Sequence, residues 1–328
     1  MKENTHFNIN FFAYALFFLL FVVGILTFKD YGIGIDDKFH RLNGFYWLDY
    51  LLSFTNFDEA KNLVKFKLNQ ISDQSLPSIE DYKKYSIIFD VPAAIIELVL
   101  KLDTTKQFYE VRHFLNFSIF FIGCIFFYKL LLLRFNKLIS LLGCIIFILS
   151  PRIYGESFYN MKDIVFLTFL ILGYFYSFKS FANYKIKNLI ILAILSALCI
   201  QTRIIGLALP LSFISFYFLS LLSKSSDIRH IYKIIFFSLM TTFFVVLFWP
   251  YLWSSPIENF FSVIKNWVPP IHIFFNGEYI QNDYLPLSYI PIWIFISTPL
   301  MHLFLFYLSI NHSLICFSRH LLTLLKIF

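Results

Sequence analysis

Long apolar runs alternate along the chain with short polar connections. A run such as FFAYALFFLLFVVGILTF contains no charged residue, and a membrane-spanning helix needs about 20 mostly apolar residues. We predict an all-α fold, a polytopic transmembrane helix bundle of about eight spans that forms a single domain over residues 1–328. The predicted spans are 7–28, 113–133, 136–150, 164–178, 188–200, 204–223, 234–253 and 287–310.

Two features of these runs qualify the prediction. The first run ends in Thr27-Phe28-Lys29-Asp30, which offers no small-residue cleavage site, so we interpret it as a retained span and not as a signal peptide. Runs of about 13–15 residues cover only ~20–23 Å of a layer roughly 30 Å thick. These short spans must recruit flanking residues or end inside the protein.

The basic residues of the connections predict the orientation. Among the short connections, to which the positive-inside rule applies, one alternate set carries nine Lys and Arg residues and the other carries four. Under the positive-inside rule the richer side is cytoplasmic, and the N-terminus lies on it. The nine are Lys129, Arg134, Lys137, Lys179, Lys185, Lys187, Lys224, Arg229 and Lys233, and the four are Arg152, Lys162, Arg203 and Lys265.

The segment 29–112 is then the first extracytoplasmic loop, and it holds 13 of the 20 Asp and Glu residues. Within it, RLNGFYWLDYLLSF and FDEAKNLVKFKLNQ have helical spacing and are predicted to lie on the membrane surface. Residues 72–82 form a turn-rich linker. The run SIIFDVPAAIIELVLK contains Asp90, Pro92 and Glu97, which favour an interfacial or re-entrant helix over a ninth span.

Composition supports the membrane class. The chain is 59% hydrophobic and 14% charged, whereas soluble domains are about 45–50% apolar. The net charge of +7 is explained by membrane orientation, because no basic run with interleaved aromatic residues lies outside the spans, and we expect no nucleic-acid partner. All four cysteines lie in apolar runs, without the paired spacing of disulfides or metal sites.

Charged residues gather on the predicted exterior side, where a charge near the hydrocarbon costs at least about 2.5–3.5 kcal/mol. Adjacent carboxylates at Asp36 and Asp37 suit general-base chemistry. Arg and Lys suit a phosphate leaving group. Together they indicate transfer from a lipid phosphate. The cluster comprises Asp36, Asp37, His40, Arg112, His113, Arg152, Glu156, Lys162, Asp163, Arg203, Glu258, His272, Glu278 and Asp283.

Each of these features also has a simpler interpretation. GIGIDD fits a solvated turn after a helix, Arg152 and Lys162 fit headgroup anchors, and Asp163 fits a helix N-cap. The histidines fit interfacial hydrogen bonding, since no HxxxH or HxxE spacing occurs. A divalent metal held by Asp37 and a distant histidine stays open, and no cofactor is assigned.

At these residues the sequence resembles the GT-C superfamily of polyprenyl-phosphate-sugar-dependent glycosyltransferases, in particular the protein O-mannosyltransferase and aminoarabinose transferase relatives. The matching pieces occur in the family's order and cover most of the chain. They are GIDDKFHRLNG, RHFLN, SPRIYGESFYNMKD, QTRIIG, WPYLWSSPIENF and LPLSYIPIWIFISTP.

The resemblance implies that a sugar on a polyprenyl phosphate is attacked, with inversion, by the hydroxyl of a lipid, glycan or protein acceptor. Asp36 would be the catalytic base, Asp37 its partner and Asp163 the second acidic position. The implied location is the cytoplasmic (inner) membrane of a bacterium, with the site outside the cytoplasm. The residues implied to bind substrate or phosphate are Arg112, Arg152, Lys162, Arg203 and His40.

One departure from the family concerns length. Family members carry further helices or a domain after the eighth span, whereas this chain stops at Phe328. A truncated member is therefore expected. Two alternatives remain: a flippase or transporter of lipid-linked sugars, for which neither mid-span ionisable groups nor two related halves are found, and an inactive membrane scaffold.

Overall fold

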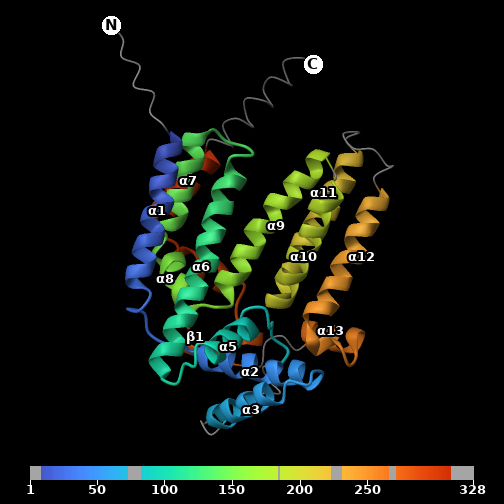
Figure 1. Ribbon diagram of the computed structural model, residues 1–328. Coiled ribbons are helices and arrows are strands. Elements are labelled where there is room, and N and C mark those ends of the chain that lie inside the picture. The colour runs from blue at the N-terminus through green and yellow to red at the C-terminus, as the bar shows by residue number, and fades with distance from the viewer. Residues whose placement is uncertain (1–8, 73–82, 184, 223–230, 266–270, 312–328) are drawn as a thin grey trace, which may run out of the picture. The chain divides into compact units, whose positions relative to one another are not determined.

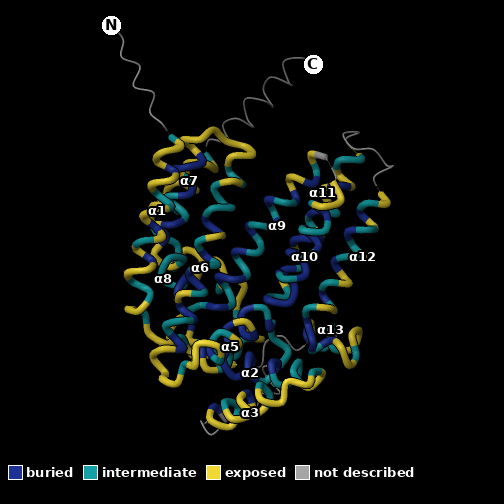
Figure 2. Tube along the Cα trace, in the orientation of Figure 1, coloured by how far each residue is buried: buried dark blue, intermediate teal, exposed yellow. Residues whose placement is uncertain are grey.

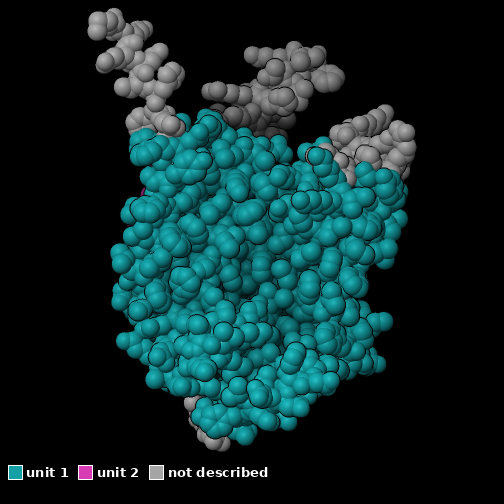
Figure 3. Space-filling model, viewed as in Figure 1, with its two compact units in different colours: residues 1–148, 153–265 teal, residues 149–152, 266–328 magenta. Residues whose placement is uncertain are grey.

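A computed structural model describes residues 9–72, 83–183, 185–222, 231–265 and 271–311. By its contacts the chain divides into two compact units, one formed by residues 1–148 and 153–265 and the other by 149–152 and 266–328. Figure 3 colours them separately. Nearly all of the predicted linker 72–82 and the amphipathic stretch 312–328 lie outside the described residues.

The first unit contains a bundle of apolar helices (Figure 1). Helix α9 packs against α6 and α10, and α10 packs against α12. Their core includes Leu192, Phe213 and Phe237, which are buried. The bundle helices are α1 (Ile9–Thr27), α6 (Thr105–Leu131), α7 (Lys137–Ile148), α8 (Pro151–Tyr159), α9 (Asp163–Asn183), α10 (Ile186–Thr202), η1 (Ile204–Leu207), α11 (Ala208–Leu222) and α12 (Ile231–Phe248).

The described helices confirm the all-α, multi-span prediction. Five are long and apolar enough to cross a membrane, and up to seven spans result if each bent helix pair is one span. The bent pairs correspond to the predicted spans 136–150 and 287–310, and the predicted span 188–200 is the shorter helix α10. Large apolar side chains such as Phe18 and Leu222 are exposed, as expected for surfaces that contact lipid. Figure 2 shows exposed positions along the bundle helices.

Four shorter helices gather at one end of this bundle (Figure 1): α2 (Asp37–Ser53), α3 (Asp58–Ser72), α5 (Asp90–Val99) and α13 (Pro256–Lys265), the last following η3 (Pro250–Leu252). Helix α2 packs against both α3 and α5. Phe45 and Leu48 of α2 are buried with Val64 of α3 and Val91 of α5. The apolar face of α2, which the sequence predicted to rest on the membrane, is therefore covered by protein. At 10 residues α5 is far too short to be a ninth span.

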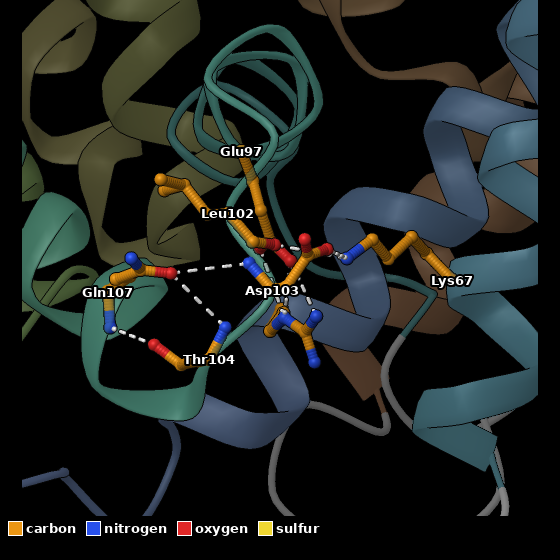
Figure 4. A network of polar contacts seen from close by, with 7 residues as sticks. Lys67, Glu97, Leu102, Asp103, Thr104 and Gln107 are labelled. Carbon is orange, nitrogen blue, oxygen red and sulfur yellow. Dashed lines mark hydrogen bonds and ion pairs between the residues drawn. The ribbon is translucent and has the colours of Figure 1, made fainter.

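The turn between α5 and α6 is fixed by polar contacts (Figure 4). Lys67 of α3 donates to the Leu102 carbonyl at 3.0 Å and to Asp103 Oδ1 at 3.1 Å. Thr104 and Gln107 form a capping box at the start of α6. These contacts tie the turn that follows α5 to α3 and fix the start of α6.

The second unit contains a hairpin of β1 (His272–Phe275) and β2 (Glu278–Gln281), which pair antiparallel. Its turn residues, Asn276 and Gly277, both have positive φ (52° and 91°), as a two-residue hairpin turn requires. After η4 (Asn282–Tyr284) the chain forms α14 (Tyr289–Ser297), which meets the helix Leu300–Asn311 at a bend of 114°.

The close approach of α2 to α5 generates the first prediction. A Cβ added at Gly44 would lie 2.4 Å from the backbone oxygen of Asp90, so Gly44→Ala must force the two helices apart. We expect it to destabilise the protein by about 1–3 kcal/mol, as overpacking does, and to lower the midpoint of thermal unfolding in detergent. Gly155→Ala is the matched control, because its Cβ would meet no heavy atom within 4 Å. Equal midpoints for the two variants would contradict the packing.

Candidate active site

A cavity of about 310 Å³ lies in the first unit, where three connections between helices meet. It collects six of the eight site residues predicted from the sequence. The α1–α2 connection and the first turn of α2 contribute Asp36, Asp37 and His40 to the lining. The α8–α9 connection and the first residue of α9 contribute Lys162 and Asp163, and Arg203 follows α10. The lining residues are Ile33, Gly34, Ile35, Asp36, Asp37, His40, Tyr159, Asn160, Met161, Lys162, Asp163 and Arg203.

The path of the chain explains why these connections meet. Helices that cross the bundle in alternate directions bring every second connection to the same end, and Figure 1 shows α2, α5 and α13 at that end. Segments more than 100 residues apart in sequence thus share one cavity.

An ion pair joins two of the connections. Arg203 Nε donates to Asp163 Oδ1 at 2.7 Å, and Arg203 Nη2 lies against the same oxygen. Asn160 supports the arrangement because its side-chain amide donates to Asp163 Oδ2 at 3.1 Å and its Oδ1 accepts from the Asp163 backbone N–H at 2.9 Å. Asp163 is the first residue of α9, so its ion pair joins the start of α9 to the residue that follows α10.

The adjacent carboxylates Asp36 and Asp37 differ in environment. Asp36 is exposed and lines the cavity, whereas Asp37 is only 2% exposed and accepts from the Gly34 backbone N–H at 2.7 Å. Burial raises the pKa of Asp37, while the Gly34 hydrogen bond and the nearby charge of His40 act to lower it. Asp37 thus shapes the loop, and Asp36 is the accessible carboxylate.

Lys162 supplies a cation whose charge depends on pH near neutrality. Burial, followed by repulsion from the Arg203 guanidinium, lowers the pKa of Lys162 to about 8, although the surrounding carboxylates act in the opposite direction. The Lys162 ammonium lies 4.0 Å from the centre of the Tyr85 ring, a cation–π contact. Lys162 can therefore hold an anion, and it does so best below its pKa.

His40 is held by a carboxylate that the sequence prediction missed. Its Nδ1 lies 3.1 Å from both carboxylate oxygens of Asp90, which is 1% exposed. Asn43 Nδ2 also donates to Asp90 Oδ2, at 2.8 Å. Asp90 thus fixes both side chains of α2 from the start of α5.

Arg112 and Arg152 do not line the cavity. Helix α6 begins at Thr105, eight residues before the predicted span, so Arg112 lies inside the helix and is 1% exposed. Its three guanidinium nitrogens find no hydrogen-bond partner among the described residues, and Asp90 and Glu97 supply opposite charge. Arg152 is exposed and belongs to the second unit.

The sequence prediction also missed the residues that hold the site together. Arg41 of α2 forms a buried ion pair with Glu97 of α5, with Nε 3.0 Å from Oε2 and Nη2 2.5 Å from Oε1. Asp90 and Glu97 are seven residues apart in an apolar run, a spacing that places both on one helix face. This signal could have identified α5 as a partner for the cations of α2. Within the described ranges, no group of three His, Cys, Asp or Glu side chains could hold a metal ion.

These features define the class of protein. Helices long enough to span a membrane carry, at one end, a cavity with an accessible carboxylate and two cations. Such a site can accept a proton from a hydroxyl and bind a phosphate. Transfer of a group from a phosphate to a hydroxyl requires both of these tasks.

Comparison with known proteins identifies the family. Residues 89–258, more than half of the chain, match the model of the dolichyl-phosphate-mannose-protein mannosyltransferase family. The chain belongs to this family, and the GT-C resemblance noted from the sequence is confirmed. Neither curated proteins nor solved structures give a match. The matched range includes Lys162, Asp163 and Arg203 and begins after Asp36 and Asp37.

The pKa of Lys162 generates the second prediction. Because Lys162 loses its charge as the pH rises through about 8, binding of farnesyl phosphate should weaken between pH 7.5 and 9.5, a range in which the phosphate stays a dianion. The affinity can be measured by microscale thermophoresis of detergent-solubilised protein. In Lys162→Arg the guanidinium stays protonated throughout, so its affinity should fall less steeply with pH than that of the wild type. If the affinity for farnesyl phosphate declined equally with pH in the wild type and in this variant, Lys162 would not be the source of the pH dependence.

Proposed function

We propose that this chain transfers mannose from a polyprenyl phosphate to an acceptor hydroxyl, with inversion, at the extracytoplasmic face of the membrane. Family membership supports a membrane mannosyltransferase that uses a polyprenyl-phosphate donor. The observation that carries the proposal is the single cavity that contains Asp36, Lys162 and Arg203.

In the proposed reaction the acceptor oxygen forms a bond to the anomeric carbon, and the bond from that carbon to the phosphate oxygen breaks. The electron pair leaves with the polyprenyl phosphate, and the hydroxyl proton passes to Asp36. Asp37 supports the loop that presents Asp36, through its bond with Gly34. Asp163 orients Arg203 toward the phosphate. Attack opposite to the leaving phosphate gives inversion.

A second cavity of the first unit suits the hydrocarbon tail of the donor. It has a volume of about 400 Å³ and is lined almost wholly by apolar side chains of α10 to α13, such as Phe237 and Phe260. Ser238 and Thr241 of α12 also line it, but their hydroxyls donate to carbonyls of their own helix. Ile200 and Leu207, on either side of Arg203 in sequence, line this cavity, so a tail there would lie beside the phosphate site.

The extracytoplasmic orientation is supported by the basic residues at the two ends of the bundle. The connections between α6 and α7 and between α9 and α10 are at the end opposite to α2 and α5 (Figure 1). These connections carry Arg134 and Lys185, and the first turns of the helices that follow them, α7 and α10, carry Lys137 and Lys187. Under the positive-inside rule such residues favour a cytoplasmic position for this end, and this supports a site outside the cytoplasm.

The base assignment generates the third prediction. Asp36→Asn removes the proton acceptor with little change in size, and a positioned base contributes about 10²–10⁴ in rate. We expect mannose transfer from polyprenyl-phosphate mannose to fall by that factor while donor binding persists. Asp30→Asn is the matched control, since Asp30 is exposed and does not line the cavity. Turnover retained in Asp36→Asn would rule out Asp36 as the base.

The orientation generates the fourth prediction. Reporter domains inserted after Ser72 and after Arg134 should report opposite sides of the membrane, because these residues lie on opposite ends of the bundle. A phosphatase, active only outside the cytoplasm, should be active at Ser72, and a fluorescent protein that folds only in the cytoplasm should fluoresce at Arg134. A cytoplasmic signal at Ser72 would overturn the proposed face.

A further inference from the structure

The pair formed by His40 and Asp90 extends the cavity beyond the residues assigned so far. Asp90 is 1% exposed, and its oxygens face His40 Nδ1 and Asn43 Nδ2. An ionised carboxylate can only accept hydrogen bonds, so when Asp90 is ionised this contact needs a proton on His40 Nδ1. The other ring nitrogen, Nε2, makes no hydrogen bond to a described residue and is available to a ligand.

The position of His40 indicates which ligand. A third cavity, only large enough for a water molecule, is lined by His40, Asp90 and Lys162, among others. His40 and Lys162 also line the cavity of about 310 Å³ described above. Asp36 and Asp37 line that cavity but not the water-sized one. His40 and Lys162 therefore border the same space in both cavities, so an anion bound there could meet both the imidazole and the ammonium.

We propose that Asp90 is a positioning residue that holds His40 so that its Nε2–H donates to the phosphate of the polyprenyl-phosphate donor. This inference rests on the proposed function. A protonated imidazole has donors on both nitrogens: Nδ1–H then pairs with Asp90 and Nε2–H with the phosphate. When the bond to the anomeric carbon breaks, the leaving oxygen gains negative charge and this hydrogen bond strengthens. No proton needs to leave His40 in the step.

Two variants test the pair with farnesyl phosphate as the probe and farnesol, which lacks the phosphate, as its matched control. A hydrogen bond from a charged donor is worth enough to change affinity by about 10- to 100-fold. His40→Gln and Asp90→Asn should each weaken farnesyl phosphate binding to that extent and leave farnesol binding unchanged. The double variant should lose no more than the larger single loss, because Asp90 acts through His40.

Asp58→Asn makes the same chemical change on α3, at a carboxylate that is 83% exposed and paired with Lys61, and it should bind farnesyl phosphate as the wild type does. If the wild type prefers farnesyl phosphate and neither His40→Gln nor Asp90→Asn weakens it, the inference fails while the proposed function stands. If the wild type shows no preference for farnesyl phosphate over farnesol, the proposed donor site itself is wrong.

A spectroscopic measurement on the wild type guards against an Asp90→Asn variant that does not fold. With ¹⁵N-labelled histidine rings, the His40 signals are identified by their absence in His40→Gln. Addition of farnesyl phosphate should give a His40 ring with protons on both nitrogens. A neutral ring with a bare Nε2 in the presence of farnesyl phosphate would overturn the inference.

Discussion

The buried ion pair between Arg41 and Glu97 is the interaction on which the site depends. Both side chains are almost fully buried, and Arg41 also lies 3.7 Å from the centre of the Phe108 ring. Removing one partner of such a pair leaves an uncompensated buried charge, at a cost of about 3–5 kcal/mol. Arg41 therefore fixes α2 against α5 and α6 at once. The same turn of α2 carries His40 into the cavity, and Asp36 immediately precedes the helix.

The contacts between α2 and α5 account for the two acidic residues of the otherwise apolar helix α5. An apolar helix of ten residues has two carboxylates, Asp90 and Glu97, and both are buried. Glu97 pairs with Arg41, and Asp90 contacts His40 and Asn43. Through these contacts the two buried carboxylates tie α2 to α5. Gly44 permits this approach, since any side chain there would strike the Asp90 backbone.

Much of the fold and part of the site could be predicted from the sequence, for different reasons. Apolar runs and their bounding charges identify the spans. Alternation of direction then predicts that Asp36, Lys162 and Arg203 lie at one end, and the cavity they share fits that prediction. Arg112 was expected just before a span, but α6 extends a further two turns beyond its apolar run, so this residue lies buried within the helix. Its role in phosphate binding stays a prediction.

The contacts that organise the site could not be predicted in the same way. Arg41 and Glu97 are 56 residues apart, and their pairing depends on which faces of α2 and α5 meet. Periodicity gives the face of each helix but not its partner. Likewise the sequence suggested a membrane-facing side for α2, whereas Phe45 and Leu48 are buried against neighbouring helices. Such choices are made by packing between segments, which a single sequence does not record.

The central claim is that cations from two separate connections bind one donor phosphate. Its most direct test is equilibrium binding of polyprenyl-phosphate mannose to the purified chain in lipid nanodiscs, with and without replacement of both Lys162 and Arg203 by Gln. We predict saturable binding that free polyprenyl phosphate displaces and that the double replacement abolishes. Absence of saturable binding, or binding that the double replacement leaves unchanged, would contradict the account.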